Sequence, residues 1–200
     1  MSKQLPAGIF PANVRQACAA LASRIARLGT ALVVLTVVSG LAAELPWIDV
    51  PFVRQVRAGC GPAAIAMVMQ YWVRHEPGLD AVAAEVERIN EALPASARGT
   101  FGNDLKAYLE THGFSAFVFN GEPKDLDHHL AKGRPLVVCL APKGSDGPLH
   151  YVVVVGAGTS EILFNDSARG KLIREGREAF LEQWKATGNW ALLAVPRQPQ

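Results

Sequence analysis

Residues 55–73 of this 200-residue chain read QVRAGCGPAAIAMVMQYWV, and the fold is decided by this stretch. Gly61-Pro62 predicts the start of a helix, because proline at the first helical position lacks an N–H that would be unpaired in any case. From Ala63 to Val73 only Gln70 is polar. A helix that is apolar on nearly every side is buried inside a domain rather than laid on its surface.

Cys60 stands at the amino-terminal end of this expected helix. Free backbone N–H groups and the helix dipole favour an anion there, which lowers a thiol pKa that is ordinarily about 8.5. The alternative is a small buried hydrophobic residue, the usual fate of a cysteine. The Gly-Pro helix start and the polar Gln55 five residues earlier favour a nucleophile.

A cysteine nucleophile needs a base beside it and a third group that orients the base. Among the five histidines, His150 stands out because it opens the apolar run Tyr151–Val155 directly after a loop. It therefore lies at the mouth of a strand, although a histidine that merely caps a strand edge remains an alternative. The other histidines lie at expected helix ends or on a short polar helix, where a solvated side chain is the default: His75, His112, His128 and His129.

Asp166 follows the next expected strand, Ile162–Asn165. Two adjacent antiparallel strands can set His150 and Asp166 side by side on one face. The carboxylate would then accept the His150 N–H and fix the tautomer of the ring. Spacing alone leaves open an ordinary Asn-Asp-Ser turn at this position.

The motif VPFVRQ at 50–55 followed by CGPAA at 60–64 resembles the opening of the C39-like cysteine peptidases. These are papain-like enzymes related to the bacteriocin-leader peptidase domains of some ABC exporters. The resemblance covers roughly residues 50–195 and continues in motifs later in the chain, namely GTF at 99–101, GRPLVV at 133–138, HYVVV at 150–154 and Asn165-Asp166.

This resemblance implies a cysteine peptidase with a triad of Cys60, His150 and Asp166 in that order. It also implies that Gln55 donates its amide to the oxyanion of the reaction, together with the Cys60 backbone N–H. No metal and no organic cofactor is expected. One residue departs from the family pattern, because Ser167 stands where the family commonly has proline after the aspartate.

The rest of the chain predicts an α+β domain, with helices first and antiparallel strands later. With the resemblance, this becomes a papain-like fold whose N-terminal helical half carries the buried nucleophile helix and packs on a C-terminal antiparallel sheet. Residues 80–93 predict an amphipathic surface helix, with Asp80 as its cap and Val82 on its inward face. The other expected helices are 103–112, 123–132 and 178–186, and the expected strands are 114–119, 135–141, 150–155, 161–165, 171–174 and 190–195.

The N-terminal segment, residues 1–43, predicts export. It contains four basic and no acidic residues, and residues 28–43 are the apolar run LGTALVVLTVVSGLAA. This pattern indicates a cleaved signal peptide or a retained membrane anchor, and either places the remaining chain outside the cytoplasm. We therefore expect a peptidase domain at 44–196, a short tail at 197–200, and membrane contact only through residues 28–43 if they are not cleaved.

Composition limits which classes of partner are expected. Beyond residue 43 the chain has 16 basic and 18 acidic residues, so nucleic acid is not an expected partner. Three cysteines are too few for a disulfide framework. The expected partner is a peptide or protein substrate outside the cytoplasm, either in the periplasm or extracellular. Two alternatives stay open: a thiol acyltransferase or amidase of the same fold, and a peptide-binding module that no longer turns over.

Overall fold

The computed structural model describes residues 45–56, 58–93, 99–141 and 147–197. The run at 28–43, expected to be a signal peptide or an anchor, lies outside the described residues, as does most of the expected tail. Within the described ranges, no helix combines the length and the apolar character needed to cross a membrane.

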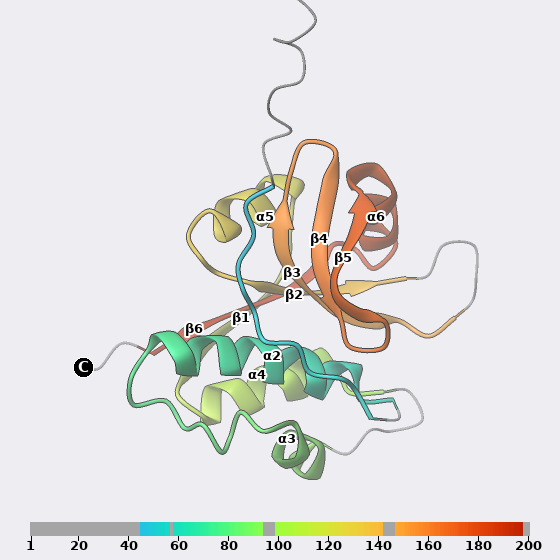
Figure 1. The fold of residues 1–200 in the computed structure, drawn as a ribbon. Coiled ribbons are helices and arrows are strands. Elements are labelled where there is room, and N and C mark those ends of the chain that lie inside the picture. The colour runs from blue at the N-terminus through green and yellow to red at the C-terminus, as the bar shows by residue number, and fades with distance from the viewer. Residues whose placement is uncertain (1–44, 57, 94–98, 142–146, 198–200) are drawn as a thin grey trace, which may run out of the picture. The chain divides into compact units, whose positions relative to one another are not determined.

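A six-stranded antiparallel sheet organises the described chain, with the strand order β1-β6-β2-β3-β4-β5 (Figure 1). The strands are β1 Phe114–Asn120, β2 Leu136–Leu140, β3 His150–Ala157, β4 Glu161–Asp166, β5 Gly170–Gly176 and β6 Trp190–Pro196. The helices are α2 Cys60–His75, α3 Val86–Ala92, α4 Gly102–Thr111, α5 Pro123–Leu130 and α6 Arg177–Lys185. The expected α+β class, with a helical half packed on an antiparallel sheet, is confirmed.

Helices cover both faces of the sheet, with α2 and α4 on one side and α5 and α6 on the other (Figure 1). Successive residues of a strand point to opposite faces, and β2 follows this rule. Val137 packs in a cluster with α2, whereas Leu136 and Val138 pack in a second cluster with α6. Every residue of β2 is therefore buried.

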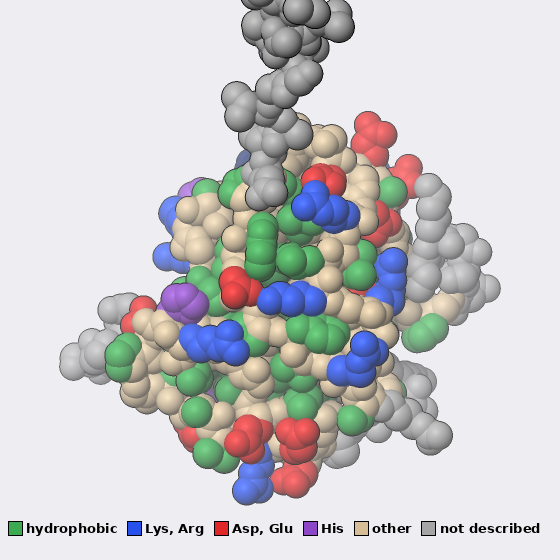
Figure 2. Space-filling view, in the orientation of Figure 1, with side chains coloured by type: hydrophobic (Ala, Val, Ile, Leu, Met, Phe, Trp, Pro, Cys, Tyr) green, Lys and Arg blue, Asp and Glu red, His purple; other side chains and the backbone are tan. Residues whose placement is uncertain are grey.

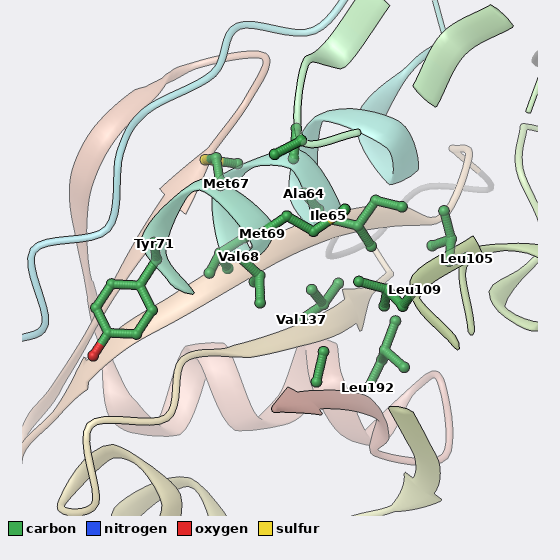
Figure 3. Close-up of a cluster of buried hydrophobic side chains, with 14 of the residues drawn as sticks. Ala64, Ile65, Met67, Val68, Met69, Tyr71, Leu105, Leu109, Val137 and Leu192 are labelled. Carbon is green, nitrogen blue, oxygen red and sulfur yellow. The ribbon is translucent and has the colours of Figure 1, made fainter. Parts of the chain in front are cut away.

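Helix α2 lies at the centre of the first cluster (Figure 3). Every residue from Gly61 to Met69 is buried, as the apolar sequence predicts. At the other end of the helix, the Tyr71 hydroxyl donates to the Gly133 carbonyl at 2.8 Å. The helix begins earlier than expected, so that Pro62 is its third residue. Pro62 still lies in the first turn, whose N–H groups have no acceptor within the helix.

The helix expected over residues 80–93 is wrong in its first half. Glu85 is extended, and α3 covers only Val86–Ala92. Asp80 does act as a cap, since its Oδ1 accepts the Val82 N–H at 2.9 Å, but the cap closes a short turn rather than a helix. Val82, expected to face inward, is 52% exposed.

Side chains from two neighbouring helices explain this shortened helix. The Tyr108 hydroxyl of α4 donates to the Ala83 carbonyl at 2.9 Å, and Gln70 Nε2 of α2 donates to the Ala84 carbonyl at 3.0 Å. In a continuous helix, these carbonyls would accept the N–H groups four residues later. The turn is thus held by tertiary contacts that the spacing of apolar residues does not reveal.

An extended segment, residues 45–55, runs past β3 and β4 to the start of α2 (Figure 1). Asn165, which is fully buried, holds this segment against the sheet. Its Nδ2 donates to the Val50 carbonyl at 3.3 Å, and its Oδ1 accepts the Leu172 N–H at 3.0 Å. The segment therefore delivers Gln55 to the end of β4.

Charged side chains of both signs are interspersed on the face that Figure 2 shows. Ion pairs at the surface of the domain include Lys171 with Asp49 at 2.6 Å and Arg174 with Glu161 at 2.7 Å. Exposed pairs of this kind contribute little to stability. Among the described residues, the face in Figure 2 has no broad basic surface.

Candidate active site

Cys60 is brought to the amino-terminal end of α2 by a tight turn. The Gly59 N–H donates to the Val56 carbonyl at 2.9 Å, and Ala58 in this turn has a φ of 54°. Residues other than glycine rarely adopt a positive φ, so this turn is locally strained. Cys60 is partly exposed, whereas Gly61 is buried. The thiol thus stands at the accessible end of a buried helix, where backbone N–H groups favour negative charge.

His150 and Asp166 come from neighbouring strands and are hydrogen-bonded. His150 opens β3, Asp166 ends β4, and His150 Nε2 lies 2.7 Å from Asp166 Oδ1. The register pairs Val153 with Asn165, so Asp166 reaches His150 diagonally rather than directly across the strands. Diagonal neighbours on one face of a sheet are within reach of long side chains.

The Asp166 carboxylate is buried and accepts several hydrogen bonds. Only 3% of the residue is exposed, and Oδ1 also accepts the N–H groups of Ala168 at 2.9 Å and Arg169 at 3.3 Å. Burial, the largest single influence, raises the pKa of this carboxyl. The bond to His150 and the two backbone N–H groups outweigh burial, so the pKa is lowered. Asp166 is therefore a carboxylate at neutral pH.

Cys60 and His150 are hydrogen-bonded, and each shifts the pKa of the other. The pKa of His150 is raised to about 9, first by its hydrogen bond to Asp166 and then by its hydrogen bond to Cys60. For Cys60, burial acts to raise the pKa, but the hydrogen bond to His150 and the backbone at Tyr151 and Gly61 together lower it. Since His150 Nε2 is bonded to Asp166, Nδ1 is left for the thiol. At neutral pH His150 is therefore an imidazolium, and its hydrogen bond favours the thiolate form of Cys60.

Cys139 has the opposite environment. It lies in β2 and is 5% exposed, and burial raises the pKa of its thiol to about 11. A buried thiol that stays protonated is a poor nucleophile. Both cysteines are free in the described chain, so only Cys60 has the environment of a reactive thiol.

Gln55 reaches the site from the extended segment and is tied to Ser167 twice. Its backbone N–H donates to the Ser167 carbonyl at 3.1 Å, and the Ser167 hydroxyl donates to Gln55 Oε1 at 2.8 Å. The sequence marked Ser167 only as a departure from a family pattern. The structure adds it to the site, and its position directly after Asp166 is the one signal that could have pointed to it.

One cavity of about 740 Å³ brings the four predicted residues together, since Gln55, Cys60, His150 and Asp166 all line it. Apolar residues line it as well: Leu140, Leu149, Val152 and Phe164. An apolar cavity with a few convergent polar groups is typical of a binding site for small molecules or peptide side chains. The arrangement can bind a chain segment and attack a carbonyl with a thiolate.

The remaining histidines lie elsewhere. His75 and His112 each place Nδ1 2.7 Å from the carbonyl four residues earlier, and His128 and His129 lie on α5. Across the described ranges, no group of three or more His, Cys, Asp or Glu side chains could hold a metal ion.

The pKa shifts of Cys60 and His150 predict a bell-shaped pH profile of activity. Because the pKa of Cys60 is lowered, the thiolate persists when pH falls below the usual thiol range. Because the pKa of His150 is raised to about 9, its proton is retained up to that pH and lost above it. Peptide hydrolysis should therefore fall above about pH 9, whereas alkylation of Cys60 by iodoacetamide should not.

The Asp166→Asn variant tests the cause of the upper limb. The hydrogen bond between His150 and Asp166 is the largest influence that raises the pKa of His150. In the variant, the fall of activity at high pH should therefore begin at a lower pH. The measurement is kcat/KM against pH for both proteins. An upper limb that stays in place would show that another group sets it.

A scan of family models and a search of solved structures place these features among known proteins. Residues 47–192 match the model described as "Peptidase_C39 like family". No curated protein sequence matches the chain.

Three solved structures are similar in fold. The peptidase domain of Streptococcus ComA, a bi-functional ABC transporter involved in quorum sensing, is 21% identical, with a TM-score of 0.56 over 72% of this chain and 97% of that domain. A putative C39-like peptidase from Bacillus anthracis is 18% identical, with a TM-score of 0.61 over 77% and 100%. A double glycine motif protease from an AMS/PCAT transporter, solved with its leader peptide, is 21% identical, with a TM-score of 0.55 over 76% and 99%. At these identities the likeness concerns the fold.

Proposed function

The chain belongs to the Peptidase_C39 like family and is a cysteine-type peptidase, and from this premise we propose which residues carry the reaction. Cys60 is the nucleophile, His150 is the base and acid, and Asp166 orients His150. Gln55 and the Cys60 backbone N–H bind the oxyanion. The observation that carries this proposal is the hydrogen-bonded chain from Cys60 through His150 to Asp166, beside a cavity that all three line.

The reaction proceeds in two steps that use the same base. The Cys60 thiolate adds to the peptide carbonyl carbon, the C–N bond breaks, and the His150 imidazolium gives its proton to the leaving amine. This leaves a thioester between Cys60 and the acyl part of the substrate. His150, now neutral, takes a proton from water, whose oxygen attacks the thioester and releases the acid and the thiolate. In both steps Gln55 would stabilise the negative charge on the carbonyl oxygen.

The substrate is proposed to be a peptide or protein segment, bound in the cavity that Cys60 and His150 line. One structure of similar fold was solved with a leader peptide. The peptidase domain is proposed to span residues 44–196, preceded by a signal or anchor at 1–43. No metal or organic cofactor takes part in the proposed steps.

Product analysis tests hydrolysis against its alternatives. The protein should cut members of a defined peptide library and leave new C-terminal carboxylates, detected by mass spectrometry, even when a primary amine is present in excess. A thiol acyltransferase would instead join the amine to the acyl fragment. A silent binding module would leave every peptide intact, and its Cys60 would react slowly with iodoacetamide.

The location of the domain is the other part of this proposal. The basic residues before the apolar run 28–43 favour retention of residues 1–27 in the cytoplasm and export of residues 44–200. The substrate would then be an exported or envelope peptide. In a bacterial host, alkaline phosphatase fused after Pro199 should be active, and a fluorescent protein that folds only in the cytoplasm should stay dark at the same position. The reverse pattern would overturn export and favour a cytoplasmic precursor as substrate.

A further inference from the structure

We propose that Ser167 is a positioning residue of the oxyanion site, which acts by fixing the orientation of the Gln55 side-chain amide. This inference rests on the role proposed above for Gln55. It concerns a residue that the family resemblance marked only as a departure, since proline is common at that position.

The contact between the two residues is specific. The Ser167 hydroxyl donates to Gln55 Oε1 at 2.8 Å, and the Ser167 carbonyl accepts the Gln55 backbone N–H at 3.1 Å. Ser167 is fully buried, so no water competes for its hydroxyl from bulk solvent. The backbone bond fixes where Gln55 lies, and the hydroxyl bond acts on the amide itself.

The bond from the Ser167 hydroxyl to Gln55 Oε1 matters because the two ends of an amide differ in chemistry. A glutamine amide carries an acceptor oxygen and a donor NH₂ on the same carbon, and the two can exchange places by rotation. Only the NH₂ group stabilises an oxyanion, because a carbonyl oxygen in its place would repel the developing charge. In the orientation that the structure has, the Ser167 hydroxyl donates to Oε1, and Nε2 is turned away from Ser167. Since Gln55 lines the cavity with Cys60, the donor is then available to the reacting carbonyl.

Asp166, the residue before Ser167, also holds a residue of the site in place. Asp166 binds His150, and Ser167 binds Gln55. One dipeptide at the end of β4 therefore holds both the base and the oxyanion donor. The extended segment that carries Gln55 is itself held against β4 by Asn165, which donates to Val50 at 3.3 Å. Residues 165–167 thus connect three parts of the site.

Two small reagents test this without an identified substrate. Acylation of Cys60 by p-nitrophenyl acetate passes through a tetrahedral oxyanion and releases p-nitrophenolate, whereas alkylation by iodoacetamide displaces iodide and forms no oxyanion. The Ser167→Ala variant should lower the acylation rate about tenfold, the scale of one lost orienting hydrogen bond. Its alkylation rate should stay within about twofold of the unaltered protein, because Cys60, His150 and Asp166 are untouched.

The Gln55→Ala background makes the test decisive. Once the amide is gone, Ser167 has nothing to orient, so Gln55→Ala/Ser167→Ala should be acylated as slowly as Gln55→Ala alone. Thr187→Val is the matched control, since the Thr187 hydroxyl donates to the Cys139 carbonyl at 2.7 Å and does not contact Gln55. This variant should leave the ratio of the acylation rate to the alkylation rate unchanged. Additive losses in the double variant, or an equal loss of alkylation and acylation in Ser167→Ala, would overturn the proposal. Failure of the peptidase proposal shows differently, as an uncut peptide library, so the two outcomes can be told apart.

Discussion

Replacing Cys60 by alanine should reduce peptide hydrolysis by roughly 10⁶-fold, the scale seen when the nucleophile of a triad is removed. No thioester can form without the Cys60 sulfur, and Cys139, the other thiol in the described ranges, is buried with a pKa of about 11. Stability should change by less than about 0.5 kcal/mol, because alanine suits the first turn of a helix and the position is partly exposed. The measurements are product formation from the peptide library and a thermal unfolding midpoint.

Cys139→Ala is the control for this variant and should keep full activity per folded molecule. Its fold should be slightly less stable, since a buried side chain in β2 is shortened. Iodoacetamide followed by peptide mapping gives a second measurement on the unaltered protein, and Cys60 should be labelled first. If Cys139 were labelled faster in the folded protein, the assignment of the nucleophile would be wrong.

Replacing Gln55 by alanine should lower kcat by about 10²–10³-fold, the usual loss for one oxyanion donor. The effect should appear in kcat more than in KM, because the donor acts on charge that develops in the transition state. Iodoacetamide should still alkylate Cys60 at the normal rate, since the thiolate depends on His150 and the end of α2. The buried Ser167 hydroxyl loses its acceptor in this variant, so a loss of stability of about 1–3 kcal/mol is also expected.

Arg54→Ala is a matched control for Gln55→Ala. Arg54 lies next to Gln55 on the same segment and donates to the Ala168 carbonyl at 3.4 Å, but it does not line the cavity of the active site. It should therefore keep kcat within a few fold. An unchanged kcat in Gln55→Ala would remove Gln55 from the proposed machinery, and an equal loss in both variants would indicate that the segment acts only as a structural element.

Much of the fold followed from local patterns in the sequence. The apolar run from Ala63 to Val73 predicted the buried helix α2, and the apolar runs in the second half of the chain predicted the strands. The order of the strands in the sheet did not follow, because the pairing of β1 with β6 joins the first strand of the described chain to the last. The short α3 did not follow either, because the side chains that capture the Ala83 and Ala84 carbonyls come from other helices.

In the site, too, some residues can be predicted from the local sequence, whereas their contacts depend on the folded chain. The sequence predicts His150 and Asp166 as site residues because each stands at the end of a strand. Their hydrogen bond depends on a register that only the folded sheet fixes. The sequence does not predict Ser167 as a partner of Gln55, because the two residues are far apart in the chain. A serine after an aspartate is ordinary in a turn, so only the folded structure reveals which acceptor its hydroxyl meets.

The division of the site between α2 and the sheet also affects the chain while it is being made. Cys60 leaves the ribosome on the first helix of the domain, long before β3 and β4 supply His150 and Asp166. Until those strands pair, the thiol lacks the hydrogen bond to His150 that lowers its pKa, and it has no base to move a proton. An incompletely folded chain therefore lacks the proposed triad, and pairing of β3 with β4 completes it.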